Sequence, residues 1–287
     1  MISDYRCFFC FARAFEILLE KEELSLTEKN SFTRGMSMLY STTYNNFSAP
    51  LFSRDLHQIL KIYSRNPDPY FEQKKQSNDI ALQMYPELKK QILHSENPFD
   101  KALRLAIAGN IIDYAVGAHF DLDDTIDKVL NSSIAIDNSS ELKTTLSKAE
   151  SVLYLGDNAG EIVFDKLFIE TIMHPNLTFV VRGEPVINDA TIHDANYVGM
   201  DKVANVISNG YNAPSTIVDK CSPEFQQLFS NADVVISKGQ GNLEGLLGKT
   251  DKEVYFILMV KCDVIAEALN VKKGDFVVKC NKMIFNN

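Results

Sequence analysis

The sequence lacks an excess of basic residues. Its 287 residues include 29 lysines and arginines against 38 aspartates and glutamates, so the formal net charge is −9 at pH 7. Because proteins bind a phosphate backbone through a basic surface, this balance argues against nucleic acid as a partner. Long hydrophobic runs are also missing. The run from Tyr255 to Val260 is among the longest, far below the ~20 residues of a membrane-spanning helix. We therefore expect no membrane insertion.

Cysteine is scarce, and its five residues are an odd number for a chain of this length. This does not suggest a disulfide framework, and a reducing cytoplasm fits best. Cys7 and Cys10 share one face of a predicted helix, but no second pair stands at zinc spacing, so we favour core packing over a structural zinc site. Arg13 and Glu16 interrupt the phenylalanine-rich start, and no small-residue cleavage site follows. We therefore do not expect a signal peptide.

The first part of the chain carries helical patterns and almost no strand signals. Ser25 with Glu28 forms a capping box before one helix, and Pro50 opens another that Asn66-Pro67 closes. We also expect helices over residues 7–20, 71–84, 86–95 and 99–114.

After Ser139 the pattern changes to β-rich apolar runs that alternate with amphipathic segments. This alternation indicates a mainly parallel sheet covered by helices on both faces. The 45% apolar content and the length of the chain suit a soluble protein with two structural units. We predict an α/β protein with a helical domain over residues 1–131 and a second domain over 132–287. The expected strands are residues 152–155, 177–181, 205–208, 234–237, 254–260 and 276–279.

The stretch from Ser151 to Glu161 is the most informative segment. It reads as a buried strand, a tight turn and a helix start. The turn would place the Asp157 carboxylate and the Asn158 amide beside backbone N–H groups that have no partner within the helix. Hard oxygen ligands suit a hard cation, and free N–H groups suit an anion such as phosphate.

Polar residues follow each of five successive predicted strands. In an open parallel sheet, ligands bind beyond the carboxyl ends of the strands. We therefore expect one polar edge that binds a ligand. The residue pairs are Asp157-Asn158, Arg182-Gly183, Asn209-Gly210, Lys238-Gly239 and Lys261-Cys262.

Several of these positions keep two interpretations. Asp189 is as good a helix N-cap as a metal ligand, whereas Asp194 further along reads as a solvated face. Glu161 in the first turn of a helix is either a partner of the helix dipole, which we slightly favour, or a group that orients water. Lys261, partly buried at a strand end, needs a carboxylate or a phosphate nearby.

The turn from Lys238 to Asn242 contains Gly239 and Gly241. Such a glycine-rich turn can bring backbone N–H groups and a lysine against an oxyanion. By itself this is weak evidence, because glycine turns close many strands.

Taken together and in this order, the motifs resemble the damage-control metal-dependent phosphatases, the ARMT-like family that was formerly a domain of unknown function. Cys7-x-x-Cys10 points to the microbial branch. The resemblance covers about residues 7–266. The motifs are Gly156-Asp157-Asn158-Ala159-Gly160-Glu161, Arg182-Gly183-x-Pro185-x-x-Asn188-Asp189-Ala190-Thr191, Lys238-Gly-x-Gly-Asn242, Lys261-Cys262, Asp68-Pro69-Tyr70 with Lys74 and Asn78, and Ala108-Gly109-Asn110-Ile-Ile-Asp113.

The resemblance implies a helical unit followed by a three-layer α/β/α sandwich with a Rossmann-like sheet. It implies a divalent cation (magnesium, manganese, cobalt or nickel) held by Asp157, Asn158 and Asp189. It also implies that Glu161, Lys261 and the turn that contains Lys238, Gly239, Gly241 and Asn242 border a small phosphorylated metabolite, such as a sugar phosphate, which the enzyme hydrolyses.

Two details concern the chemistry. Aspartyl-phosphate enzymes usually carry a second acid two residues after the nucleophile, where this chain has Ala159, so Asp157 reads as a ligand. We expect Lys261 and Lys238 to stabilise the phosphoryl oxygens, with the helix start after Asn158 adding N–H donors.

Two rival functions remain. Gly156-x-x-x-Gly160 weakly resembles an adenosyl-methionine loop, as in a carboxyl methyltransferase, although Arg182 stands where a ribose-binding acid would be expected. A non-catalytic metabolite-binding protein would also explain the polar edge. Asn110 and Asp113 are equally compatible with substrate contact and with helix capping.

Overall fold

The computed structural model describes residues 4–109 and 129–282, so Asn110 and Asp113 lie outside the described residues. Its helices are α1 (Tyr5–Lys21), α2 (Leu26–Thr43), α3 (Ala49–Ser64), α4 (Phe71–Leu93), α5 (Pro98–Ala108), α8 (Ser139–Leu146), α9 (Glu161–Ile172), α10 (Ile192–Tyr197), α11 (Pro223–Asn231), α12 (Gly239–Leu246) and α13 (Asp263–Leu269). Its strands are β1 (Ile134–Asp137), β2 (Val152–Leu155), β3 (Leu177–Val181), β4 (Asn205–Ser208), β5 (Val234–Lys238), β6 (Val254–Met259) and β7 (Phe276–Cys280). Short 3₁₀ turns are η1 (Tyr44–Asn46), η3 (Met200–Lys202) and η4 (Val218–Lys220).

The seven strands form one sheet in the order β1-β7-β6-β5-β2-β3-β4. Strands β2 to β6 are mutually parallel, whereas β7 runs antiparallel to β6 and β1 follows the direction of β7. After β4 the chain returns to place β5 on the other side of β2, so the winding direction changes between β2 and β5. In sheets of this kind ligands bind at that crossover, beyond the carboxyl ends of the strands.

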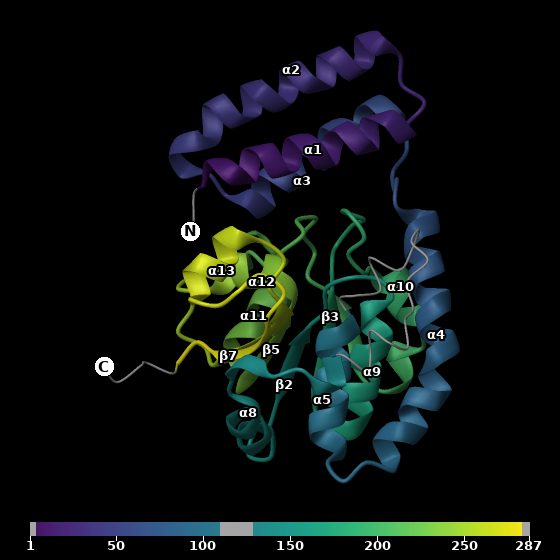
Figure 1. The fold of residues 1–287 in the computed structure, drawn as a ribbon, viewed down its shortest axis with the longest axis vertical. Helices are drawn as coiled ribbons and strands as arrows, with labels where there is room; N and C mark the ends of the chain where they lie inside the picture. The colour runs from purple at the N-terminus through teal and green to yellow at the C-terminus, as the bar shows by residue number, and fades with distance from the viewer. Residues whose placement is uncertain (1–3, 110–128, 283–287) are drawn as a thin grey trace.

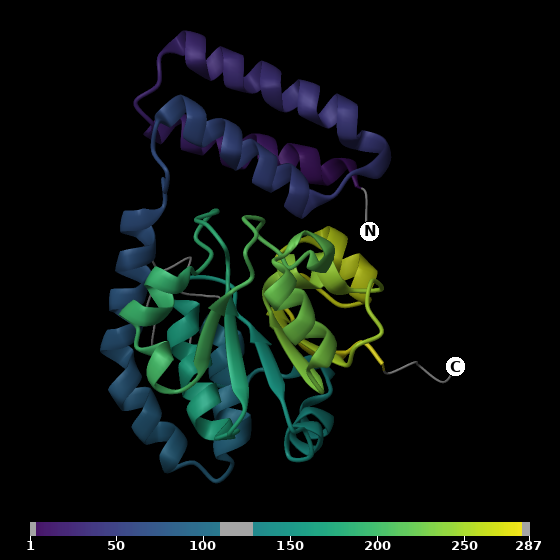
Figure 2. The same cartoon turned by 180° about the vertical axis from the view of Figure 1, so that it is seen from behind.

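Helices cover both faces of the sheet, which confirms the predicted α/β fold class (Figure 1). One face packs its apolar side chains against α4, α5 and α9, and the other against α11, α12 and α13. Figure 2 shows the same layers from behind. Among the described residues, no helix is both long and apolar enough to cross a membrane.

Helices α1 to α3 form a separate bundle that stands over the ends of the sheet strands, and we call this bundle the cap (Figures 1 and 2). The cap has its own hydrophobic cluster, built around Phe15, Phe32, Phe47 and Phe52. By contrast, the buried side chains of α4 and α5 belong to the cluster of the sheet. The hydrophobic clusters thus divide the helical part after α3, while the domain boundary at 131 stays a prediction.

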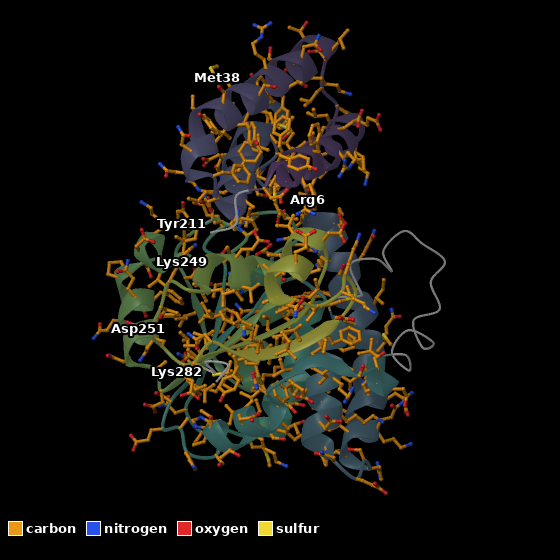
Figure 3. The ribbon with its side chains drawn as sticks, turned by 60° about the vertical axis from the view of Figure 1, so that its left-hand side comes forward. Arg6, Met38, Tyr211, Lys249, Asp251 and Lys282 are labelled. Atoms are coloured by element: carbon orange, nitrogen blue, oxygen red, sulfur yellow. The ribbon has the colours of Figure 1, made fainter. Side chains whose placement is uncertain are left out.

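Polar contacts join the cap to the sandwich. Arg6 of α1 donates two hydrogen bonds, of 2.7 and 2.6 Å, to the Glu267 carboxylate of α13. From α3, Arg54 donates to Asn212 at 2.8 Å and Lys61 donates to the backbone oxygen of Pro185. Figure 3 shows Arg6 and Tyr211 at this junction.

Two local predictions were wrong, and one strand was missed. Residues 71–84 and 86–95 form the single helix α4, which continues through Pro86. The missing N–H bond at Pro86 is outweighed because Leu88 and Ile92 beyond it are buried in the sheet cluster. Strand β1 was not predicted. Core packing was predicted for both N-terminal cysteines, but Cys10 is exposed and Cys7 is only partly buried.

Candidate active site

Main-chain hydrogen bonds join the turn after β2 to the loop after β3. The Ala159 N–H donates to Asn188 O at 2.9 Å, and the Ala190 N–H donates to Asp157 O at 2.8 Å. Asn158 and Asp189 form an isolated antiparallel bridge between these bonds. The two turns that carry the predicted metal ligands are therefore held together by the backbone itself.

One guanidinium group connects the side chains of these turns. Arg182, at the end of β3, donates from Nε to Asp189 Oδ2 at 2.6 Å and from Nη2 to Asp157 Oδ1 at 3.3 Å. Its Nη1 donates to Asn242 Oδ1 at 3.0 Å. Arg182 is only 2% exposed. It therefore balances part of the negative charge within a water-poor site.

The carboxylates of this site have raised pKa values. Burial is the main reason that the pKa of Asp157 lies well above its usual range. The nearby charges of Asp189 and Glu161 add to the effect, and Arg182 and Lys261 oppose it. Burial likewise raises the pKa of Asp189 against the opposing charge of Arg182. Burial therefore disfavours the ionised form of both carboxylates, and a bound cation would oppose this effect.

The donor set fits a hard divalent cation. Asp157 and Asp189 offer carboxylate oxygens and Asn158 offers an amide oxygen, the ligand types that magnesium and manganese prefer. No group of three His, Cys, Asp or Glu residues suited to a metal ion occurs within residues 4–109 and 129–282. The predicted set has two carboxylates and one amide, so the amide would be essential to it.

The amino end of α12 packs directly on Asp157. Gly239 has a φ of +78°, and a Cβ built there would lie 2.0 Å from Asp157 Oδ2. A Cβ at Gly241 would lie 2.2 Å from Pro214 O. Both glycines are thus required by close approach. The first N–H groups of α12, which have no partner within the helix, start beside the carboxylate cluster.

The start of α9 does not present the free N–H groups that we predicted. Gly160 N donates to the Asn78 side chain at 2.7 Å, and Ile162 N donates to Asn158 O at 3.2 Å. Because the Ala159 N–H is also bonded, this turn is occupied by protein acceptors. The amino end of α12 is the better place for an anion.

Lys238 does not lie where we predicted a substrate cation. Its side chain is fully buried, and Nζ donates to Glu161 at 2.7 Å, Asp165 at 2.6 Å and Ala106 O at 2.8 Å. Burial opposes its charge, but Asp165 and Glu161 outweigh this effect and raise its pKa. An ammonium group has three N–H donors, and all three are used inside the protein.

Lys261 lies close to the carboxylate cluster. Its charge opposes the rise in the pKa of both Asp157 and Asp189. Its backbone N–H donates at 3.0 Å to the side chain of Gln240, in the first turn of α12. Lys261 is only partly buried, so it remains the candidate for contact with a charged ligand.

The start of α10 excludes one of the two interpretations of Asp189, the helix N-cap. Thr191 is the N-cap of that helix and forms a capping box with Asp194, so Asp189 is not the cap. Asp194 is 3% exposed, and the prediction of a solvated face was wrong. It accepts from Asn78 at 3.2 Å and from Lys74 at 3.3 Å, which links α4 to the site.

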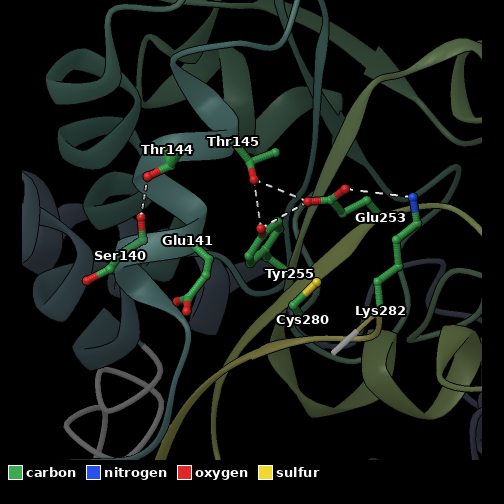
Figure 4. Close-up of a pocket in the computed structure, with 8 residues that line it drawn as sticks. All are labelled: Ser140, Glu141, Thr144, Thr145, Glu253, Tyr255, Cys280 and Lys282. Carbon is green, nitrogen blue, oxygen red and sulfur yellow. Dashed lines mark hydrogen bonds and ion pairs between the residues drawn. The ribbon is translucent and has the colours of Figure 1, made fainter. Parts of the chain in front are cut away.

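A hollow of about 510 Å³ lies at the amino end of β6, beside α8. Figure 4 shows that Thr145, Glu253 and Tyr255 hydrogen-bond to one another there. These three side chains thus satisfy one another's polar atoms within the lining of the hollow.

The chain is similar along most of its length to known proteins. The chain is 34% identical over 288 residues to the damage-control phosphatase PH1575 of Pyrococcus horikoshii, covering 98% of this chain and 99% of that protein. It is 35% identical over 246 residues to a damage-control phosphatase of Archaeoglobus fulgidus, covering 83% of each. The crystal structure of PH1575, described as a DUF89 family protein, superposes with a TM-score of 0.87 at 32% identity, over 98% of this chain and 100% of that one.

A family description matches almost the whole chain. It spans residues 3–277 and is that of the damage-control phosphatase ARMT1-like domain. The predicted resemblance is therefore confirmed, and the chain belongs to the ARMT1-like damage-control phosphatase family.

Proposed function

We propose that this protein is a divalent-metal-dependent phosphatase that hydrolyses small phosphorylated metabolites, with sugar phosphates as the first candidates. The observation that carries the proposal is the backbone bridge that brings Asp157, Asn158 and Asp189 together at the crossover of the sheet. The curated relatives that are named damage-control phosphatases support the same reaction class.

The three ligands suit magnesium, manganese, cobalt or nickel. When bound, the cation supplies Lewis-acid stabilisation of the phosphoryl group. A bound cation would in turn stabilise the ionised form of the two buried carboxylates. Asp157, Asn158 and Asp189 would hold the cation with three oxygens, which would leave room for water and for the substrate.

The chain's own groups would hold the phosphoryl oxygens. The amino end of α12 offers backbone N–H groups at Gly239 and Gly241, and Lys261 adds a positive charge from the end of β6. Arg182 would keep Asp157 and Asp189 in place rather than reach the substrate, since each of its three nitrogens already donates to a protein side chain. The cap above the strand ends would limit access of bulk water.

The methyltransferase alternative fits the geometry less well. The turn from Gly156 to Gly160 would have to accept the cofactor, but Phe179 lies against Gly156 and Asn78 binds Gly160 N. The end of β3, where a ribose-binding acid would be expected, carries Arg182 instead. Its guanidinium group is paired with the carboxylates of Asp157 and Asp189. We therefore retain the phosphatase proposal.

The test is hydrolysis of p-nitrophenyl phosphate with each of the four metals. We expect metal-stimulated activity in the wild-type protein, and a loss of at least about 100-fold in Asp157→Ala and Asp189→Ala. The matched control is Asp251→Ala, an exposed carboxylate far from the site (Figure 3). Unchanged metal-stimulated rates in both ligand variants would sink the assignment. Binding of labelled adenosyl-methionine without a cation would favour the methyltransferase, and indifference to every cation would favour a binding protein.

A further inference from the structure

A buried ion cluster lies directly beneath the candidate metal site. Lys238 of β5 stands between two carboxylates of α9, Glu161 and Asp165, at 2.7 and 2.6 Å. The exposed fractions of Lys238, Glu161 and Asp165 are 0%, 1% and 0%. The third donor of the lysine goes to Ala106 O in α5 at 2.8 Å. The cluster therefore ties β5, α9 and α5 together.

Burying this cluster costs free energy, because its charged groups lose their contact with water. It brings two carboxylates and one ammonium out of water, and well-packed apolar residues usually stabilise a core as well or better. Asp165 reflects the cost, because burial raises its pKa to about 6 despite the opposing charge of Lys238. Its Oδ1 also accepts from the Tyr154 hydroxyl of β2 at 2.7 Å. Asp165 Oδ1 thus accepts two hydrogen bonds, whereas Oδ2 is buried without a partner. An arrangement this specific and this costly suggests a role beyond packing.

The cluster reaches the metal site through Glu161. While Oε1 accepts from Lys238, Oε2 accepts from Asn158 Nδ2 at 3.4 Å. The same amide nitrogen donates to Asp157 Oδ2 at 3.2 Å. The NH₂ end of the Asn158 amide, which is its donor end, thus faces both carboxyl groups. The amide oxygen is thereby left on the other side of the group.

We propose that Asp165 is a positioning residue of the metal site. Through Lys238 it holds Glu161, and Glu161 holds the Asn158 amide with its oxygen directed to the divalent cation. Asp165 touches neither cation nor substrate and acts only through this chain of contacts. The inference rests on the proposed function, because it requires Asn158 to be a ligand. Groups that orient ligands from behind typically change metal affinity or activity by about 10- to 100-fold.

The experiment measures Mn²⁺ binding by calorimetry, alongside thermal unfolding of each metal-free variant. Asp165→Asn keeps the shape of the side chain but removes its charge, and we expect it to weaken Mn²⁺ binding about tenfold. Glu161→Gln should do the same. Because both act through one path, the double variant should bind no more weakly than Glu161→Gln alone. Asp251→Asn, on the surface, should leave the affinity unchanged.

Tyr154→Phe keeps the test decisive if Asp165→Asn does not fold. It removes only the hydroxyl that holds Asp165 Oδ1, and we expect it to weaken Mn²⁺ binding at least twofold. A merely structural cluster predicts lower unfolding temperatures with unchanged Mn²⁺ affinity, which would overturn the inference. Additive losses in the double variant would also overturn it. If the wild-type protein binds no Mn²⁺, the proposed function fails and this inference fails with it.

Discussion

The cap and the sandwich bury different types of side chain. The cap core consists of phenylalanine rings and aliphatic side chains, with His57 as its buried titratable group. The sandwich buries carboxylates, an arginine and lysines at the carboxyl ends of its parallel strands. An aromatic core needs only shape and volume, whereas a charged interior needs every partner in place. The buried charges of the sandwich therefore lower its stability in exchange for a chemically active site, whereas the core of the cap has no such cost.

The largest expected effect comes from breaking the charged interior. Lys238→Met leaves Glu161 and Asp165 buried without a cation, and we expect the free energy of unfolding to fall by about 3–5 kcal/mol. Denaturant unfolding of the metal-free protein measures this loss. Lys249→Met, at an exposed position of the same region, is the control and should change stability by less than about 0.5 kcal/mol. A loss below about 1 kcal/mol for Lys238→Met would show that the interior of the sandwich does not depend on this ion cluster.

Low pH should destabilise the cap through protonation of His57. Burial lowers the pKa of this ring to about 4, against 6.5 when exposed, and Nδ1 lies 2.8 Å from Ser53 O. The unfolded chain therefore binds a proton between pH 6.5 and 4 that the folded cap cannot bind. Stability is present above pH 6.5 and falls by about 3 kcal/mol as the pH reaches 4. Unfolding experiments across this range should show a shallower pH dependence for His57→Gln, with His94→Gln, on the exposed end of α4, as the control. Equal slopes in all three proteins would contradict the assignment.

A pair of glycines sharpens the comparison within the sandwich. Gly239 and Gly248 have φ of +78° and +72°, so alanine is strained at both. Only at Gly239 does the new Cβ meet Asp157, whereas nothing lies within 4 Å of it at Gly248. We expect Gly239→Ala to lower turnover of p-nitrophenyl phosphate about 100-fold by displacing the carboxylate. Gly248→Ala should leave turnover nearly unchanged. Similar kinetics in the two variants would refute close packing of α12 on the site.

The smallest effect should come from the aromatic core. Phe32 is 1% exposed and stacks on Phe15 with ring centroids 5.3 Å apart. Phe32→Leu keeps an apolar side chain of somewhat smaller volume, and we expect a loss of about 1 kcal/mol. Turnover and Mn²⁺ affinity should remain at wild-type values. A large drop in either quantity would mean that the packing of the cap also tunes the site.

The sequence predicted the parallel part of the sheet well, because buried strands appear as short β-rich runs. Strands β2, β3 and β4 have the predicted bounds. Strand β1 was missed. Short length and an edge position do not explain this, because β4 also has four residues at the other edge of the sheet. The sequence also predicted that polar residues gather beyond the carboxyl ends of the strands, because those ends lie on the same side of a parallel sheet. What the sequence could not supply was the bridge between residues 157–159 and 188–190, which is a tertiary contact.

The burial of Lys238 was missed, although a signal was present. Side chains of a strand alternate between faces, so Lys238 shares the face of Val234 and Ile236, toward α5 and α9. Glu161 and Asp165 stand four residues apart in an otherwise apolar helix start and so point the same way. Two acids and one lysine on facing apolar surfaces imply a buried ion cluster. The role of Asn78 had no such signal, since it depends on how α4 crosses the start of α9.

The backbone bridge between the two ligand-bearing turns has a consequence for how this protein can change over time. Main-chain bonds do not depend on which side chains surround them, so the distance between the two acidic positions is insulated from most substitutions nearby. Residues of the cap and of the surrounding loops can then be substituted, which would change the surface around the site. A chain built this way can acquire new substrates while the part that would bind the ion stays the same.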